Sequence, residues 1–256
     1  MRRACVLLGA ILCAGTAAAE GPRVVDVPTR PGVTQRFLYV PAADAKAAAI
    51  LFAGGHGGLA IDASGAFAWG AGNFLVRSRA LFAERGVSVA VIDAPSDRQA
   101  QPWLGGFRQT PEHAADVRAV VAWLRNEIKR PVWLVGTSRG TQSAAATALA
   151  GVGADGLVLT STILVDPRGR PVLGMPVERL AIPVLVVHHK DDGCAVTPYA
   201  QTSALVARLT GATRKSLVTL EGGKDTGDPC EAFAHHGFPG LERDVVDAIV
   251  AFMLAK

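Results

Sequence analysis

Residues 136–140 read Gly-Thr-Ser-Arg-Gly and place Ser138 between two glycines. An apolar run, residues 131–135, comes immediately before this segment, and a stretch of small residues, 141–150, follows it. Ser138 is therefore predicted to stand where a buried strand turns sharply into a helix. A Cβ atom in place of either glycine would strike the neighbouring strand or helix, so the turn depends on both. This context favours a nucleophilic serine over the alternative, an ordinary serine that caps a helix.

A serine hydroxyl is a poor nucleophile at neutral pH, so it needs a base and a third group that orients the base. Candidates for both occur late in the chain. The apolar run 184–187 leads into a polar segment that contains Asp191 and Asp192, and His235 and His236 precede the final helical stretch. The acids could also be solvated loop residues, and the histidines a plain surface pair.

Several more histidines and aspartates could in principle gather round a metal ion. The chain has no helical H-x-x-x-H pattern and no paired C-x-x-C pattern, so no metal site and no cofactor are expected. The residues considered were His56, His188, His189, Asp191, Asp192, His235 and His236. We expect His113 to be a solvated helix residue.

The elements that must position these residues alternate between β-prone runs and helical stretches, which predicts an α/β fold with a mostly parallel central sheet and helices on both faces. Thr110 and Thr197 precede prolines and are predicted to cap helices. Strands are predicted over residues 23–27, 35–40, 48–52, 87–92, 132–135, 156–159, 183–187 and 216–220. Helices are predicted over residues 73–85, 111–129, 138–150, 197–209 and 241–254.

This order of elements resembles the α/β-hydrolase fold over essentially the whole mature chain. Two opening antiparallel strands, the strand–turn–helix at Ser138, a late acidic loop and a late histidine loop all come in the order expected of that fold. In similar hydrolases the acid lies five residues into a motif that begins His-Gly, which implies Asp192, with His189 in place of the glycine. A histidine followed two residues later by an aromatic is the commoner form, which implies His236. Asp191 and His235 remain the alternates.

The resemblance also implies an oxyanion hole. Attack by Ser138 would leave a negative oxygen that needs N–H donors, and one of them would be the backbone of Arg139. The segment 54–58, Gly-Gly-His-Gly-Gly, is similar to the glycine-rich oxyanion loop of esterases. Gly55 is the first choice for the second donor and His56 the next. The other interpretations are a flexible surface loop or a phosphate cradle, although the Lys-Ser/Thr ending of a P-loop is missing.

The surroundings of the site can be predicted in part. Many α/β-hydrolases carry a large lid between two late strands, but here that segment, residues 161–182, is short and holds four prolines or glycines. We therefore expect no large lid and an open site. The segment 95–109 is expected to border the substrate pocket, where Trp103 and Phe107 either line the pocket or pack beneath it.

The first 19 residues have the three-part layout of a secretory signal peptide. Two arginines at positions 2 and 3 precede an apolar stretch, 4–14, which is followed by three alanines at 17–19. We predict cleavage after Ala19, a mature α/β-hydrolase domain at 20–256, and a secreted or periplasmic protein. The apolar stretch is shorter than the roughly 20 residues that a membrane span needs, so no membrane anchor is expected.

Two cysteines, Cys194 and Cys230, remain after removal of the signal peptide. An even pair in an oxidising compartment predicts a disulfide bond, with two independent buried thiols as the alternative. Because these cysteines flank Asp192 and His236, a disulfide would tie the acid loop to the histidine loop.

The formal net charge of +4 and the absence of any basic run give no indication of nucleic-acid binding. Together these features predict a serine hydrolase that cleaves a small-molecule carboxylic ester through an acyl-enzyme. The alternatives are a peptidase or amidase on the same fold and a binding protein that kept the fold without activity.

Overall fold

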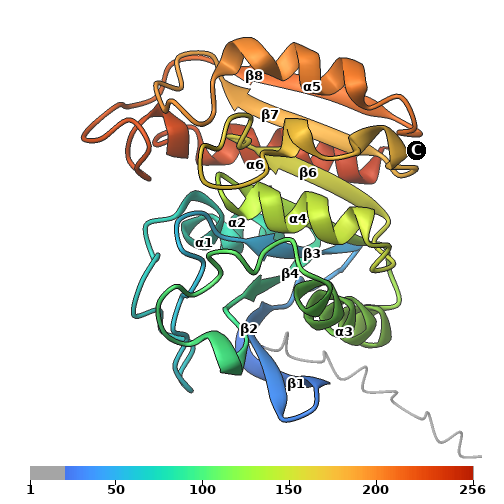
Figure 1. Cartoon of the computed structure of the whole chain (residues 1–256). Coiled ribbons are helices and arrows are strands. Elements are labelled where there is room, and N and C mark those ends of the chain that lie inside the picture. Colours follow the sequence, from blue (N-terminus) through green and yellow to red (C-terminus); the bar gives the residue numbers. More distant parts are fainter. Residues whose placement is uncertain (1–20, 256) are drawn as a thin grey trace, which may run out of the picture.

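The computed structural model describes residues 21–255, so the predicted signal peptide at 1–19 lies outside the described residues. One eight-stranded sheet forms its centre, with the strand order β1-β2-β4-β3-β5-β6-β7-β8 (Figure 1). β1 and β2 form an antiparallel hairpin, β2 pairs antiparallel with β4, and every later pair is parallel. The strands are β1 (Arg23–Arg30), β2 (Val33–Val40), β3 (Ala47–Phe52), β4 (Val87–Ile92), β5 (Val132–Thr137), β6 (Gly156–Thr160), β7 (Val184–His189) and β8 (Lys215–Leu220).

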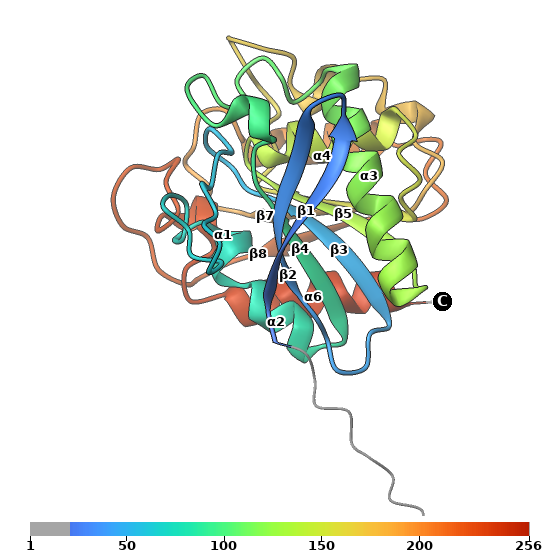
Figure 2. The same cartoon turned by 90° about the horizontal axis from the view of Figure 1, so that it is seen from below.

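Helices cover both faces of this sheet (Figure 2). One apolar core joins the sheet to α3, α4 and α5, and a second joins the opposite face to α1, α2 and α6. Strands β3 to β7 are buried along their whole length, and their near-continuous apolar sequences follow from that double cover. The helices are α1 (Phe74–Arg77), α2 (Arg79–Glu84), α3 (Pro111–Ile128), α4 (Gly140–Leu149), α5 (Thr202–Arg208) and α6 (Glu242–Leu254). None of the helices within residues 21–255 is both long and apolar enough to cross a bilayer.

All eight predicted strands are present, with ends shifted by at most three residues. The predicted helix 73–85 is wrong in one respect, because it is broken at Ser78 into α1 and α2. Ser78 has φ −91° and ψ 0°, and the regular ladder is interrupted there because the N–H of Leu81 donates to the Ser78 carbonyl, three residues back instead of four. The helix predicted from 111 is correct, and the Thr110 hydroxyl caps it by accepting the His113 N–H at 3.2 Å.

Two further predictions are wrong. Thr197 does not cap a helix, because Pro198 is extended, a 3₁₀ turn follows at Tyr199–Gln201, and α5 begins only at Thr202. His113 is not solvated: its side chain is buried between two rings, those of Phe52 and Phe107. The amphipathic pattern of α3 places this histidine on the face that covers the sheet.

Candidate active site

Ser138 occupies the turn between β5 and α4, as the sequence predicts. Its φ of +51° lies in the left-handed region, which residues other than glycine rarely adopt. A Cβ on Gly140 would lie 2.0 Å from the carbonyl oxygen of Phe52, and one on Gly136 would lie 2.5 Å from the carbonyl oxygen of Gly140. Only glycine fits at either position, so these two residues allow the strained turn that presents Ser138 at the carboxyl end of the sheet.

The glycine-rich loop 54–58 passes directly against this serine. A Cβ on Gly54 would lie 2.9 Å from the Cβ of Ser138. Gly55 has φ +56°, a conformation that suits glycine. Within residues 21–255, the backbone N–H groups of Gly55 and Arg139 donate to no protein acceptor. Of the two candidate oxyanion donors, Arg139 thus follows Ser138 directly in the chain, and Gly55 belongs to the loop that packs beside it.

His56, the alternate oxyanion residue, is held by aromatic packing. Its ring lies 3.8 Å from the ring centroid of Trp69 and 5.2 Å from that of Trp103. Its Nδ1 accepts the N–H of Gly58 at 3.1 Å. Partial burial, and then the charge of Arg108, hold the pKa of His56 below its ordinary value. The imidazole is therefore neutral at neutral pH.

Asp93 fixes the chain immediately after this loop. Its buried carboxylate accepts the N–H groups of Leu59 at 2.6 Å, Ala60 at 3.2 Å and Ile61 at 2.8 Å. A carboxylate that accepts several backbone N–H groups holds them in one geometry. No local sequence pattern points to these partners of Asp93, which lie more than 30 residues away in the chain.

Asp192 and His236 are the acid and histidine that the structure brings together. His236 Nδ1 lies 3.0 Å from Asp192 Oδ2 and 3.3 Å from Oδ1, and both side chains are buried. The other ring nitrogen, Nε2, is buried and makes no hydrogen bond within the described residues. His236 therefore has one nitrogen fixed by a carboxylate and one left for a reacting group.

Three groups support the Asp192 carboxylate. Thr197 donates its hydroxyl to Oδ2 at 2.9 Å, and the N–H of Cys194 donates to Oδ1 at 3.0 Å. Burial alone would raise the pKa of Asp192, but the hydrogen bond and charge of His236 and the N–H of Cys194 hold it below its ordinary value. The acid is consequently ionised at neutral pH, as the orienting member of a catalytic triad must be.

His188 is the third group, and its protonation follows from its contacts. Its Nε2 accepts the N–H of Thr162 at 2.8 Å, so the proton of the neutral ring sits on Nδ1, which lies 3.9 Å from Asp192 Oδ2. Burial lowers the pKa of His188 to about 4. Because the His188 ring is neutral, it does not offset the negative charge of the Asp192 carboxylate, which therefore acts on His236. The Ser161 hydroxyl, from the end of β6, donates to the backbone carbonyl of His236 at 2.7 Å.

The two alternates stand apart from this pair. Asp191 is exposed, and its N–H donates to Nδ1 of His189 at 3.0 Å. His235 stacks on His189 with ring centroids 4.1 Å apart, and its Nδ1 lies 3.3 Å from the backbone carbonyl of Asp191. Among the described residues, no ion pair joins the Asp191 carboxylate to a histidine.

The predicted disulfide between Cys194 and Cys230 is present. It joins the loop that follows β7 to the exposed segment that precedes the 3₁₀ turn His235–Gly237. The backbone N–H of Cys194 also donates to the Asp192 carboxylate, so the disulfide is connected to the acid through Cys194.

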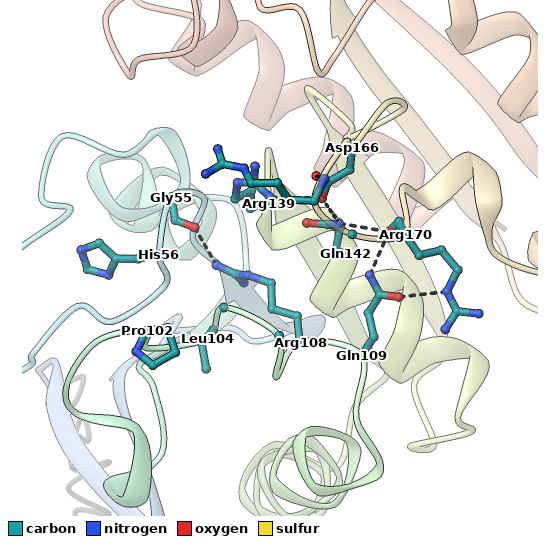
Figure 3. Close-up of a pocket in the computed structure, with 14 residues that line it drawn as sticks. Gly55, His56, Pro102, Leu104, Arg108, Gln109, Arg139, Gln142, Asp166 and Arg170 are labelled. Carbon is teal, nitrogen blue, oxygen red and sulfur yellow. Dashed lines mark hydrogen bonds and ion pairs between the residues drawn. The ribbon is translucent and has the colours of Figure 1, made fainter.

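A pocket of about 520 Å³ is bordered by the candidate oxyanion residues Gly55, His56 and Arg139, the last of which follows Ser138 in the chain (Figure 3). The predicted contribution of segment 95–109 is confirmed for residues 102, 104–106, 108 and 109, but the aromatic rings do not line the pocket. Trp103 packs on His56, and Phe107 is buried. The lining residues are Gly55, His56, Pro102, Leu104, Gly105, Gly106, Arg108, Gln109, Arg139, Gln142, Asp166, Arg168, Gly169 and Arg170.

Comparison with known proteins identifies the fold. No family model matches the chain, and no curated protein matches it by sequence. Among solved structures, it is similar to a cold-adapted esterase from an Arctic intertidal metagenomic library, with a TM-score of 0.60 and 20% identity over 90% of this chain and 92% of that one. It is similar to a lidless α/β serine hydrolase from Xanthomonas campestris, with a TM-score of 0.58 and 17% identity over 93% and 95% of the two chains.

Est1E from Butyrivibrio proteoclasticus, solved with bound ferulic acid, has a TM-score of 0.61 and 17% identity over 90% of this chain and 98% of that one. Together with the mostly parallel sheet, these likenesses show an α/β-hydrolase fold. The Xanthomonas neighbour is described as lidless, and in this chain the segment between β6 and β7 forms two short 3₁₀ turns, Val172–Gly174 and Val177–Arg179. Within residues 21–255, no group of three or more histidines, cysteines or acids is arranged to hold a metal ion.

Proposed function

We propose that this protein is a serine hydrolase that cleaves carboxylic esters through an acyl-enzyme. The observation that carries the proposal is the pairing of His236 Nδ1 with the Asp192 carboxylate at 3.0 Å, at the same edge of the sheet as the strained Ser138. β5 and β7 are parallel members of one sheet, so the segments that follow them, with Ser138 and Asp192, meet at its carboxyl edge.

In the proposed reaction, Ser138 Oγ attacks the ester carbonyl carbon while His236 Nε2 takes the hydroxyl proton. Asp192 keeps the proton of the imidazole on Nδ1 and stabilises the imidazolium that forms. The backbone N–H of Arg139 and that of Gly55, with His56 as the alternate, hold the oxyanion. As the intermediate collapses, His236 returns its proton to the departing alkoxide, and water then releases the acyl group by the same steps in reverse.

Ester cleavage is favoured over the two rival functions by separate observations. One structural neighbour described above is named as an esterase, and another was solved with a carboxylic acid, ferulic acid, bound. An amidase or peptidase would use the same triad, so the leaving group must be tested directly. A binding protein without activity has no need of an ionised, buried Asp192 aligned on a histidine whose second nitrogen is free of protein partners.

The first test is the substitution Ser138→Ala, assayed on short acyl esters and on matched amides and peptides. Removal of the nucleophile is expected to lower kcat by about 10⁴-fold or more while the protein stays folded. A fluorophosphonate probe should label the wild type at Ser138 and leave the variant unlabelled. Esterase activity close to wild type in Ser138→Ala would refute the serine mechanism, and a folded wild type that neither labels nor turns over would favour the binding protein.

The second test uses the neighbouring residues as matched controls. Asp192→Asn and His236→Ala are expected to lower kcat/KM by at least 10³-fold, because each removes a member of the aligned pair. Asp191→Asn and His235→Ala are each one residue away, yet lie outside that pair, so losses below about tenfold are expected. A reversed order in either pair would show that the acid or the base has been assigned to the wrong residue.

A further inference from the structure

The pocket beside Ser138 carries an excess of positive charge. Four arginines line it, and only one carboxylate belongs to the same lining. That carboxylate, Asp166, already accepts the Gln142 amide at 2.9 Å, the Arg139 guanidinium at 3.2 Å and the N–H of Arg168 at 3.0 Å. Asp166 can neutralise one arginine at most, so the pocket remains cationic.

Arg108 is the most unusual member of this set, because it is buried and meets only neutral acceptors. Its guanidinium donates to Ser143 Oγ at 2.9 Å and to the carbonyl oxygens of Gly55 at 3.1 Å and Ala53 at 3.4 Å. Within residues 21–255, no carboxylate accepts from it. Burial and then the charge of Arg139 lower the pKa of Arg108 to about 9, so the side chain is still charged at neutral pH. Buried charges are normally paired, and this one has no counter-charge.

Two more arginines, Arg168 and Arg170, stand at the exposed rim of the pocket. Arg170 donates from Nε to Gln109 Oε1 at 3.0 Å, and Figure 3 shows its guanidinium beside Gln109 at the edge of the pocket. Arg168 makes no ion pair within the described part of the chain. Within residues 21–255, neither the Arg168 nor the Arg170 guanidinium forms an ion pair with a carboxylate.

Few apolar side chains line the pocket. Pro102 and Leu104 are the only apolar side chains among the described lining residues. A site built for a long alkyl chain would be lined mainly by hydrophobic and aromatic side chains. The lining of this pocket therefore disfavours a neutral fatty ester and favours a polar, negatively charged group.

We propose that the substrate is an anionic ester, whose ionised acid group binds to Arg108 and the rim arginines while its ester carbonyl lies at Ser138. This inference rests on the proposed esterase function, because it names the substrate class of the same site. A guanidinium presents its N–H donors in a planar fork that matches a carboxylate, and such charge-assisted hydrogen bonds are stronger than neutral ones. The bound anion would supply the counter-charge that Arg108 lacks.

A purely structural role for Arg108 makes a different prediction. Its contacts with Ala53 and Gly55 would then serve only to hold the oxyanion loop, and its loss would slow neutral and anionic esters equally. The informative quantity is therefore the ratio of kcat/KM for an anionic ester to kcat/KM for a neutral ester of matched shape.

Two matched ester pairs measure this ratio. 4-Nitrophenyl hydrogen adipate against 4-nitrophenyl hexanoate places the charge on the acyl side, and 4-acetoxybenzoate against its methyl ester places it on the alcohol side. The wild type should prefer the anionic member of one pair by about 10- to 100-fold, the range that one charged hydrogen bond supplies. Arg108→Met should remove most of that preference, and Arg168→Gln with Arg170→Gln should reduce it about threefold to tenfold at low salt and less at high salt.

Arg130→Gln is the matched control, because Arg130 is exposed at the opposite edge of the sheet, just before β5. This variant should keep the wild-type ratio of kcat/KM for the anionic ester to kcat/KM for the neutral ester. The wild-type pair that shows the preference identifies the side of the ester that carries the charge. If neither pair shows a preference, or if Arg108→Met slows both members of a pair equally, the inference is wrong.

A binding measurement separates this inference from the esterase proposal. In Ser138→Ala, which has no nucleophile, adipate should raise the melting temperature in a titration, and the neutral 1,6-hexanediol should not. The same titration in Ser138→Ala with Arg108→Met should show no shift. A protein that hydrolyses no ester but binds adipate through Arg108 would overturn the esterase function and keep the anion site. An esterase that is stabilised neither by adipate nor by 4-hydroxybenzoate, the acid released on the alcohol side, would overturn the anion site alone.

Discussion

Replacement of His113 by leucine should make the protein less sensitive to acid. The imidazole is buried at the start of α3 between Phe52 and Phe107, and neither ring nitrogen has a partner within the described residues. Burial, followed by the charges of Arg108 and Arg30, lowers the pKa of His113 from 6.5 to about 3. The folded protein therefore keeps this ring neutral at any pH above about 3.

The sign of the effect follows from this pKa. The unfolded chain takes up a proton on His113 below pH 6.5 and the folded chain does not, so the free energy of unfolding falls as the pH falls from 6.5 towards 3. At about 1.4 kcal/mol per pH unit, the loss at pH 5 is roughly 2 kcal/mol. Leucine has a similar volume and no proton to take up, and it removes two buried nitrogens that lack partners.

Urea unfolding at pH 8 and at pH 5 measures this difference. His113→Leu should be at least as stable as the wild type at pH 8, and its advantage should grow by about 2 kcal/mol at pH 5. Since all other titrating groups are shared by the two proteins, the change in their difference isolates His113. An advantage that is the same at both pH values would refute the assignment of a neutral, buried ring.

Three other outcomes are expected. Thr197→Val should lower kcat/KM by about tenfold and shift the acid limb of its pH profile to higher pH, because the charged form of Asp192 loses a hydrogen bond. Thr197→Ser should restore both kcat/KM and the profile. A profile that does not shift would leave Thr197 with a packing role only. The double substitution Cys194→Ser with Cys230→Ser should lower the free energy of unfolding by about 4 kcal/mol, for a 36-residue separation. If the disulfide also orders the triad, kcat/KM measured well below the new Tm should fall. An unchanged kcat/KM would leave the disulfide a purely stabilising role. Mass spectrometry of secreted or periplasmic protein should find a chain that begins at Glu20, and an unprocessed chain would contradict the predicted signal peptide.

The sequence predicts those parts of the molecule whose determinants lie close together in the chain. The turn at Ser138 needs two glycines, a preceding strand and a following helix, and all of these fall within about twenty residues. The buried strands are equally readable, since a strand covered on both faces is apolar throughout. The break at Ser78 was missed, because the helical pattern of residues 73–85 continues through a serine that a helix tolerates.

The charge of the pocket could not be predicted, because its arginines come from distant parts of the chain. Arg108 precedes α3, Arg139 follows β5, and the remaining arginines lie between β6 and β7. Only the strand order brings these loops to one edge of the sheet. Asp93 and Ser161 were missed for the same reason, since their partners are more than 30 residues away.

Thr197 shows why local rules fail at a site such as this one. A threonine before a proline is a good helix N-cap, worth about 1 kcal/mol. A hydroxyl that donates to a buried carboxylate contributes more, about 1.5–3 kcal/mol, and Thr197 makes that bond to Asp192 at 2.9 Å. The stronger interaction wins, so the hydroxyl bonds Asp192 instead of capping a helix, and α5 starts five residues later. Thr110 also precedes a proline, and its hydroxyl accepts the His113 N–H at 3.2 Å, so α3 begins where the sequence predicts.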